Sequence, residues 1–126
     1  MFFDTDIAVK ETASSLIEAY DRNMQRTIAG YDLLIQVDVE KSQLFGGPGL
    51  ATHHSLFQSD KEKALQNLRV SAWRAIVNNL GLYKVMSLKR TRTFDENCEE
   101  GKLPEINTEN VHGFLEDVLG NAHEIA

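Results

Sequence analysis

Six basic side chains in the middle of the chain are the residues best suited, by type and spacing, to bind anionic groups. Three of them crowd into the run Lys89-Arg90-Thr91-Arg92. Side chains of this kind bind the phosphate groups of nucleic acids and so position a protein on them. The candidate nucleic-acid-binding residues are therefore Arg69, Arg74, Lys84, Lys89, Arg90 and Arg92.

The distribution of charge leaves a second interpretation of these cations open. The formal net charge is −6, yet residues 59–94 carry 8 basic and 2 acidic side chains, whereas residues 95–126 carry 1 basic and 9 acidic ones. In one interpretation the basic stretch is kept for phosphates or an acidic partner. In the other, acidic helices pack beside it and neutralise it, with ion pairs such as Arg92 with Glu96 one turn along.

Residues for covalent or metal chemistry are few. Cys98 is the single cysteine, and four acidic residues surround it between positions 95 and 100. Their field raises the pKa of a thiol and suppresses the reactive thiolate. The histidines do not have the spacing of two to four residues that is typical of zinc ligands; they are His53, His54, His112 and His123. We therefore expect no catalytic residue, no metal and no cofactor in this chain.

The first third of the chain has the pattern of an amphipathic helix. Apolar residues recur every three or four positions from Ala13 to Ile35. Residues 33–39 also alternate between apolar and polar, as a half-buried strand would. The sequence contains no second alternating run of comparable length to pair with such a strand, which favours helix. We predict a long N-terminal helix over about residues 5–41.

Glycine and capping residues divide the next part of the chain. The glycine-rich run that begins at Leu44 predicts a loop over about residues 44–58. Ser59 and Glu62 then have the spacing of a capping box, which opens a helix that Gly81 ends.

Further capping signals follow towards the C-terminus. Ser87 is placed to divide residues 82–100 into two helical pieces, and Gly101 ends the second of them. Asn107 caps a last helix, and Ile106 and Val111 have the spacing of a hydrophobic staple across its start.

These elements predict an all-α fold of four to five helices, a long N-terminal amphipathic helix followed by a compact helical bundle over about residues 59–126. A length of 126 residues favours a single helical domain, residues 1–126. The apolar repeat is still running at Ala126. A chain that ends here and the N-terminal part of a longer protein both fit this pattern.

The length of the first helix predicts self-association. A helix over residues 5–41 is about 55 Å long, whereas a compact domain of this size is about 36 Å across. The helix must then break, with Gly30 the best site, or project and expose apolar side chains such as Tyr31, Leu34 and Ile35. Exposed stripes of this kind bind second chains. We predict a homodimer through the first helix.

Composition places the protein in the cytoplasm. One cysteine forms no disulfide within the chain, which is typical of reducing compartments. Apolar runs stay well short of the roughly 18 residues that a membrane span needs, and the first residues are acidic rather than basic as in a secretory signal. The sequence thus predicts a cytoplasmic protein without a membrane partner.

Several short motifs in the second half resemble an uncharacterised bacterial family, a domain of unknown function found in phage, plasmid and other mobile-element proteins. The motifs are, in order, Ala72-Trp73-Arg74, Gly81-Leu82, Met86, Leu103-Pro104 and Thr108-Glu109-Asn110-Val111. The resemblance covers about residues 60–126 and carries over no catalytic residue. It implies a methyltransferase partner, because an adenosylmethionine-dependent methyltransferase domain accompanies some members. The chain itself lacks the glycine-rich loop and the Asn/Asp-Pro-Pro-aromatic tetrapeptide of such an enzyme.

Two functions fit these observations. The leading hypothesis is a non-catalytic helical interaction module of a mobile-element protein, working by protein association and by contact with nucleic acid. The alternative is the N-terminal scaffold of a larger or partnered DNA-modifying enzyme. A block of His, Asp and Ser with strand patterning after Ala126 in the parent gene would favour the enzyme.

Overall fold

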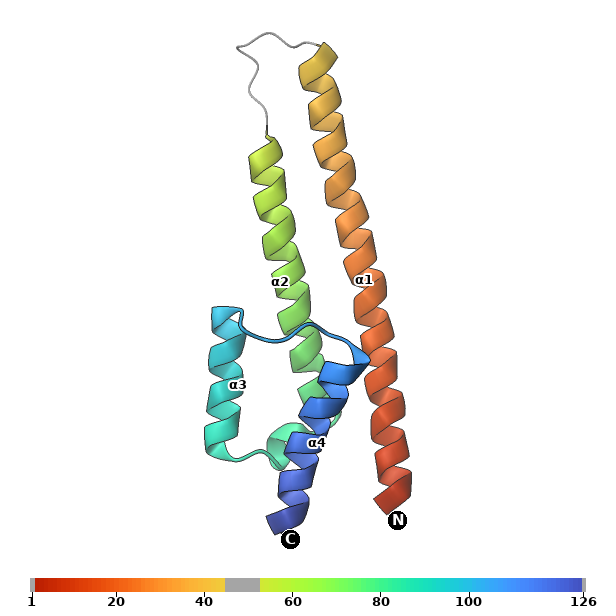
Figure 1. Ribbon diagram of the computed structural model, residues 1–126, viewed down its shortest axis with the longest axis vertical. Helices are drawn as coiled ribbons and strands as arrows, with labels where there is room; N and C mark the ends of the chain where they lie inside the picture. Colours follow the sequence, from red (N-terminus) through yellow and green to blue (C-terminus); the bar gives the residue numbers. More distant parts are fainter. Residues whose placement is uncertain (1, 45–52, 126) are drawn as a thin grey trace. The chain divides into compact units, whose positions relative to one another are not determined.

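The computed structural model describes the backbone of residues 2–44 and 53–125 and the side chains of residues 7–44 and 53–120. Over the described residues it holds four α-helices and one short 3-10 helix, without strands. These are α1 (Phe2–Leu44), α2 (His54–Asn79), η1 (Leu82–Lys84), α3 (Leu88–Glu100) and α4 (Thr108–Ile125) (Figure 1). The prediction of an all-α fold that begins with a long helix is confirmed. Most of the predicted glycine-rich loop lies outside the described residues.

The first helix is continuous. α1 runs through residues 33–39, so the helical interpretation of that stretch is correct. Of the two alternatives that the length of this helix left open, the break at Gly30 does not occur, because the helix passes through this residue as well. A glycine costs a helix about 1 kcal/mol relative to alanine, and the space around Gly30 is open, so no neighbouring group wedges the turns apart.

Four helix ends follow the capping signals in the sequence. Gly81 and Gly101 adopt left-handed backbone conformations, with φ angles of 62° and 69°. The Ser87 hydroxyl accepts a hydrogen bond from the Arg90 amide at 3.1 Å and caps α3. Asn107 does the same for α4, since its side-chain oxygen accepts from the Asn110 amide at 2.7 Å. These local signals fix both ends of α3 and the start of α4.

The start of α2 corrects the sequence prediction. The helix begins at His54 rather than at Ser59, so Ser59 and Glu62 lie inside it and residues 54–58 are helical. The cap comes from α1, where the Asp38 carboxylate accepts a hydrogen bond from the His53 amide at 2.9 Å. A carboxylate at a helix N-terminus satisfies a free amide and interacts well with the helix dipole. Because Asp38 lies fifteen positions before His53, the residues around the start of α2 contain no local signal for this cap.

The described chain divides into two compact units. Unit 1 combines residues 1–20 with residues 69–126, and unit 2 is residues 21–68. Unit 1 contains the core, with Trp73, Ile76, Val77, Leu82, Val111 and Val118 as its largest fully buried side chains.

Unit 2 is a pair of helical segments, one from α1 and one from α2, that lie side by side (Figure 1). The Lys61 ammonium group is 2.8 Å from the Asp32 carboxylate, and the Asp38 side chain contacts His54. None of the described side chains in residues 21–68 is fully buried. Leu34 is exposed as predicted, whereas Tyr31 and Ile35 are half-buried on the side of α1 that faces α2.

Candidate functional site

Two of the six candidate cations are neutralised within unit 1. The Arg69 guanidinium lies 3.2 Å from the Glu105 carboxylate and donates a hydrogen bond to the Leu103 carbonyl at 3.4 Å. Arg74 lies 3.9 Å from the Asp95 carboxylate. For these two residues the structure agrees with the interpretation in which acidic segments pair with the basic stretch.

The other four cations are Lys84 at the end of η1 and three residues in the first turns of α3, Lys89, Arg90 and Arg92. Lys84, Lys89 and Arg92 are exposed, and Arg90 is half-buried. None of them forms an ion pair with a carboxylate in the described part of the chain, so the predicted pair of Arg92 with Glu96 is not formed. The structure thus leaves a basic surface of four side chains, called here the α3 basic surface.

Acidic residues limit the extent of the α3 basic surface. Glu96, Glu99 and Glu100 are exposed in the second half of the same helix, and Glu100 forms an ion pair with Lys102 at 2.8 Å. Any polyanion bound at the first turns of α3 would be repelled by the last ones. The first turns themselves favour anions, because the positive end of the helix dipole adds to the side-chain charges.

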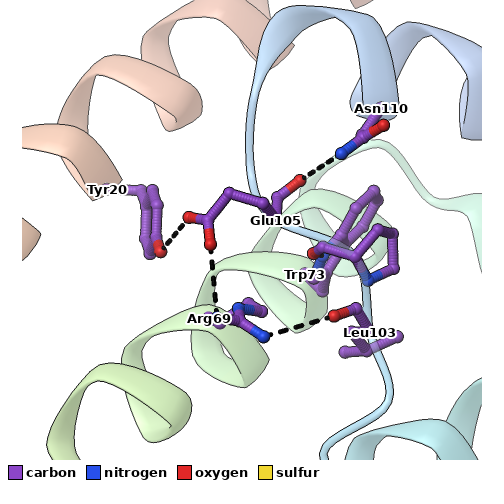
Figure 2. A network of polar contacts seen from close by, with 7 residues as sticks. Tyr20, Arg69, Trp73, Leu103, Glu105 and Asn110 are labelled. Carbon is purple, nitrogen blue, oxygen red and sulfur yellow. Dashed lines mark hydrogen bonds and ion pairs between the residues drawn. The ribbon is translucent and has the colours of Figure 1, made fainter. Parts of the chain in front are cut away.

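A network of polar contacts centres on Glu105, in the link between α3 and α4 (Figure 2). One carboxylate oxygen accepts a hydrogen bond from the Tyr20 hydroxyl of α1 at 2.7 Å, while the other lies near Arg69 of α2. The Glu105 carbonyl accepts from the Asn110 side chain of α4 at 2.9 Å. Glu105 therefore joins three helices of unit 1.

The same link is held to α2 by Trp73. Its indole nitrogen donates to the Pro104 carbonyl at 2.8 Å, and its ring packs edge-on against Phe114 with centroids 5.2 Å apart. Trp73 is 1% exposed. Trp73 is therefore a core residue rather than a platform for stacking bases.

The network changes the acidity of Tyr20. Burial and the neighbouring Glu105 carboxylate raise the pKa of its phenol to about 12, and Arg69 opposes part of this effect. A phenol that stays protonated donates a hydrogen bond reliably but makes a poor general base at neutral pH. The geometry is therefore that of a structural clamp.

Cys98 lies in the core of unit 1. Burial is the main cause of its raised pKa, Arg74 opposes the rise, and Asp95 and Glu99 add to it. The direction of the shift was expected from the acidic flanks alone, but the larger cause is loss of hydration, which the flanking residues do not reveal. A buried neutral thiol is a weak nucleophile.

The histidines do not meet in a metal site among the described side chains. No group of three or more His, Cys, Asp or Glu residues is arranged to hold a metal ion in that part of the chain. His123 lies outside the described side chains, so its predicted alignment with His112 and Glu116 is not described either. His54 contacts Asp38 instead and belongs to the start of α2.

Sequence reasoning missed the roles of Tyr20, Glu105 and Asn110. A signal for part of the network was nevertheless present, because the motifs that carry the family resemblance meet there. Trp73 belongs to one motif and contacts Pro104 of another, and Asn110 of a third binds the neighbouring Glu105. These motifs mark the contacts that hold the α3–α4 link in place.

Comparisons with known proteins support the resemblance to an uncharacterised domain of unknown function. Residues 65–126 match the family model of a domain of unknown function, DUF4942. Neither a curated protein nor a solved structure matches the chain. None of the helices in the described part combines the length and the apolar character needed to cross a membrane.

Proposed function

We propose that this chain is a non-catalytic helical interaction module that associates with a second copy of itself through α1. Its two units act as a single helical domain of a cytoplasmic mobile-element protein. The mobile-element setting rests on the family resemblance alone.

The observation that carries the proposal is the exposed apolar surface of α1 within unit 2. Leu33 is 60% exposed, Leu34 47% and Val37 39%. Three large aliphatic side chains within five positions of one helix form a patch that favours protein association over solvent. Burial raises the pKa of both Tyr20 and Cys98, so neither side chain is an activated nucleophile at neutral pH.

Light scattering at micromolar concentration tests the association. We expect a species of twice the 14.2 kDa chain mass. Leu33→Glu combined with Val37→Glu should convert it to the monomer, because four charges would face each other across the contact. Leu88→Glu is the matched control, since Leu88 is 85% exposed in unit 1. A native chain with the mass of a monomer in light scattering would contradict the proposal.

A second function, contact with nucleic acid, is favoured by the α3 basic surface. Its four cations have no carboxylate partner among the described residues, and three of them, Lys89, Arg90 and Arg92, stand at the N-terminal end of α3. Phosphate groups suit both features. In a larger assembly the same contact would suit a scaffold for a DNA-modifying enzyme, such as a methyltransferase.

Salt-dependent binding to duplex and single-stranded DNA tests the second function. Replacing Lys89, Arg90 and Arg92 by alanine should weaken binding and lower the log-log salt slope by about 0.9 per lost duplex phosphate contact. Arg22, Lys41 and Lys63 are exposed cations elsewhere. Their triple alanine variant has the same net charge and should bind as the native chain does. Absence of binding at low salt excludes this function.

A further inference from the structure

The exposed side of α1 in unit 2 has six positions with heptad spacing, three of which hold large apolar side chains, Leu33, Val37 and Leu44. Positions 26, 30, 33, 37, 40 and 44 are separated alternately by four and three residues, and all six are exposed. This spacing places side chains along one seam of a helix, as in a coiled coil. The seam is Arg26, Gly30, Leu33, Val37, Glu40 and Leu44.

The seam is distinct from the contact between α1 and α2. The residues of α1 that face α2 are half-buried, among them Tyr31, Ile35 and Val39, and they fall between the seam positions on the opposite side of the helix. The ion pair of Asp32 with Lys61 also belongs to the contact between α1 and α2. The seam therefore has no partner within the described part of unit 2.

The charges on the seam are arranged symmetrically about Leu33. Arg26 lies seven positions before Leu33 and Glu40 seven positions after it. Gln36 donates a hydrogen bond to the Glu40 carboxylate at 3.2 Å, which holds that side chain on the helix without neutralising it. Two parallel copies would place Arg26 against Arg26 and Glu40 against Glu40. Two antiparallel copies would place each Arg26 opposite the Glu40 of the other copy.

We propose that two copies of the chain pair along this seam in antiparallel orientation, with a two-fold axis near Leu33. Leu33 of one copy packs on Leu33 of the other at the axis. An ion pair of Arg26 with Glu40 closes each end. This inference rests on the homodimer proposed above and adds its orientation and register.

Disulfide cross-linking separates the orientation from the dimer itself. Leu33→Cys should cross-link under mild oxidation, because residue 33 meets its own copy on the axis. Glu40→Cys should not, since the two copies of residue 40 lie about 21 Å apart along an antiparallel pair, far beyond the reach of a disulfide. The native chain is the control, as Cys98 is buried.

Each outcome has a definite meaning. Cross-linking of both variants overturns the antiparallel register and leaves the homodimer standing. If neither variant cross-links, the proposed seam is wrong. Light scattering on the native chain then shows whether the chain forms a homodimer at all.

Charge reversal gives an independent readout of the register. Arg26→Glu or Glu40→Arg alone should each weaken the dimer about tenfold, because two exposed ion pairs become two repulsive contacts. The double variant should restore the native dissociation constant. In a parallel dimer, single reversals only exchange one pair of like charges for another. Single variants with the native constant would therefore overturn the proposal.

Discussion

The two units of this chain use their apolar side chains in opposite ways. Every buried hydrophobic side chain among the described residues lies in unit 1, whereas five of the eight exposed large ones, Leu33, Leu34, Val37, Leu44 and Leu56, lie in unit 2. Burial of apolar surface is the main source of folding stability. Unit 1 therefore provides most of the stability, whereas unit 2 leaves apolar surface exposed.

Substitutions in the core of unit 1 should have the largest effect. Trp73→Ala removes a side chain that is 1% exposed together with its hydrogen bond to Pro104. We expect a loss of about 3–5 kcal/mol in the free energy of unfolding, measured by urea denaturation. Leu33→Ala in unit 2 should change the value by less than about 0.5 kcal/mol at concentrations where the chain is monomeric. Equal losses would erase the distinction between the units.

The Glu105 clamp should contribute less than the core. Tyr20→Phe deletes one hydroxyl and leaves the Glu105 carboxylate with Arg69, so we expect a loss of about 0.5–1.5 kcal/mol. The pKa of Tyr20 is about 12 in the folded chain and 10.0 ordinarily, so the unfolded state releases this proton first. The contribution of Tyr20 is therefore present below pH 10 and falls as pH rises from 10 to 12.

The free energy of unfolding of the native chain minus that of the Tyr20→Phe variant, measured by denaturation across this pH range, isolates the contribution of the Tyr20 hydroxyl. The native chain should lose its advantage over the variant as pH rises towards 12. A difference that is constant with pH would show that the hydroxyl acts without Glu105.

A glycine substitution in unit 1 should have a smaller effect of the opposite sign. Gly113 lies in α4 with open space where a Cβ would be. Gly113→Ala should raise the free energy of unfolding by about 0.5–1 kcal/mol, because alanine loses less backbone entropy in a helix. Gly30→Ala meets equally open space in unit 2. If unit 2 opens separately, Gly30→Ala should slow the hydrogen exchange of amides in unit 2 and leave the midpoint of global unfolding almost unchanged.

The smallest and most local effect is expected at the start of α2. Asp38→Asn weakens the cap on the His53 amide, so hydrogen exchange of residues 54–57 should speed up while unit 1 keeps its protection. Although desolvation opposes it, hydrogen bonding to His53 and His54 lowers the pKa of Asp38 below 3.8. The cap is therefore present above that value and is lost as pH falls through the lowered pKa. Asp32→Asn is the control, and protection that survives acid would contradict this account of the cap.

Local patterns in the sequence were sufficient to predict most of the fold. The caps at Ser87 and Asn107 and the turns at Gly81 and Gly101 depend on residues within a few positions of each other, so they could be read directly. The start of α2 could not, because its cap is Asp38 from another helix.

The candidate site was predictable only in part. The positions of Lys89, Arg90 and Arg92 in the first turns of α3 followed from the Ser87 cap. The pairing of Arg69 with Glu105 and of Arg74 with Asp95 joins segments far apart in the sequence, and charge counts alone do not select such pairs. The role of Tyr20 was hidden because its partner lies 85 positions away.

Hydrogen exchange at two protein concentrations tests most directly whether unit 1 provides the stability and unit 2 the surface for association. At the lower concentration, amides of residues 21–44 and 54–68 should exchange faster than those in the unit 1 segments of α2 and α4, because unit 2 opens without exposing a core. At the higher concentration, residues 26–44 should gain protection and unit 1 should not change. Equal protection of both units, independent of concentration, would contradict the account.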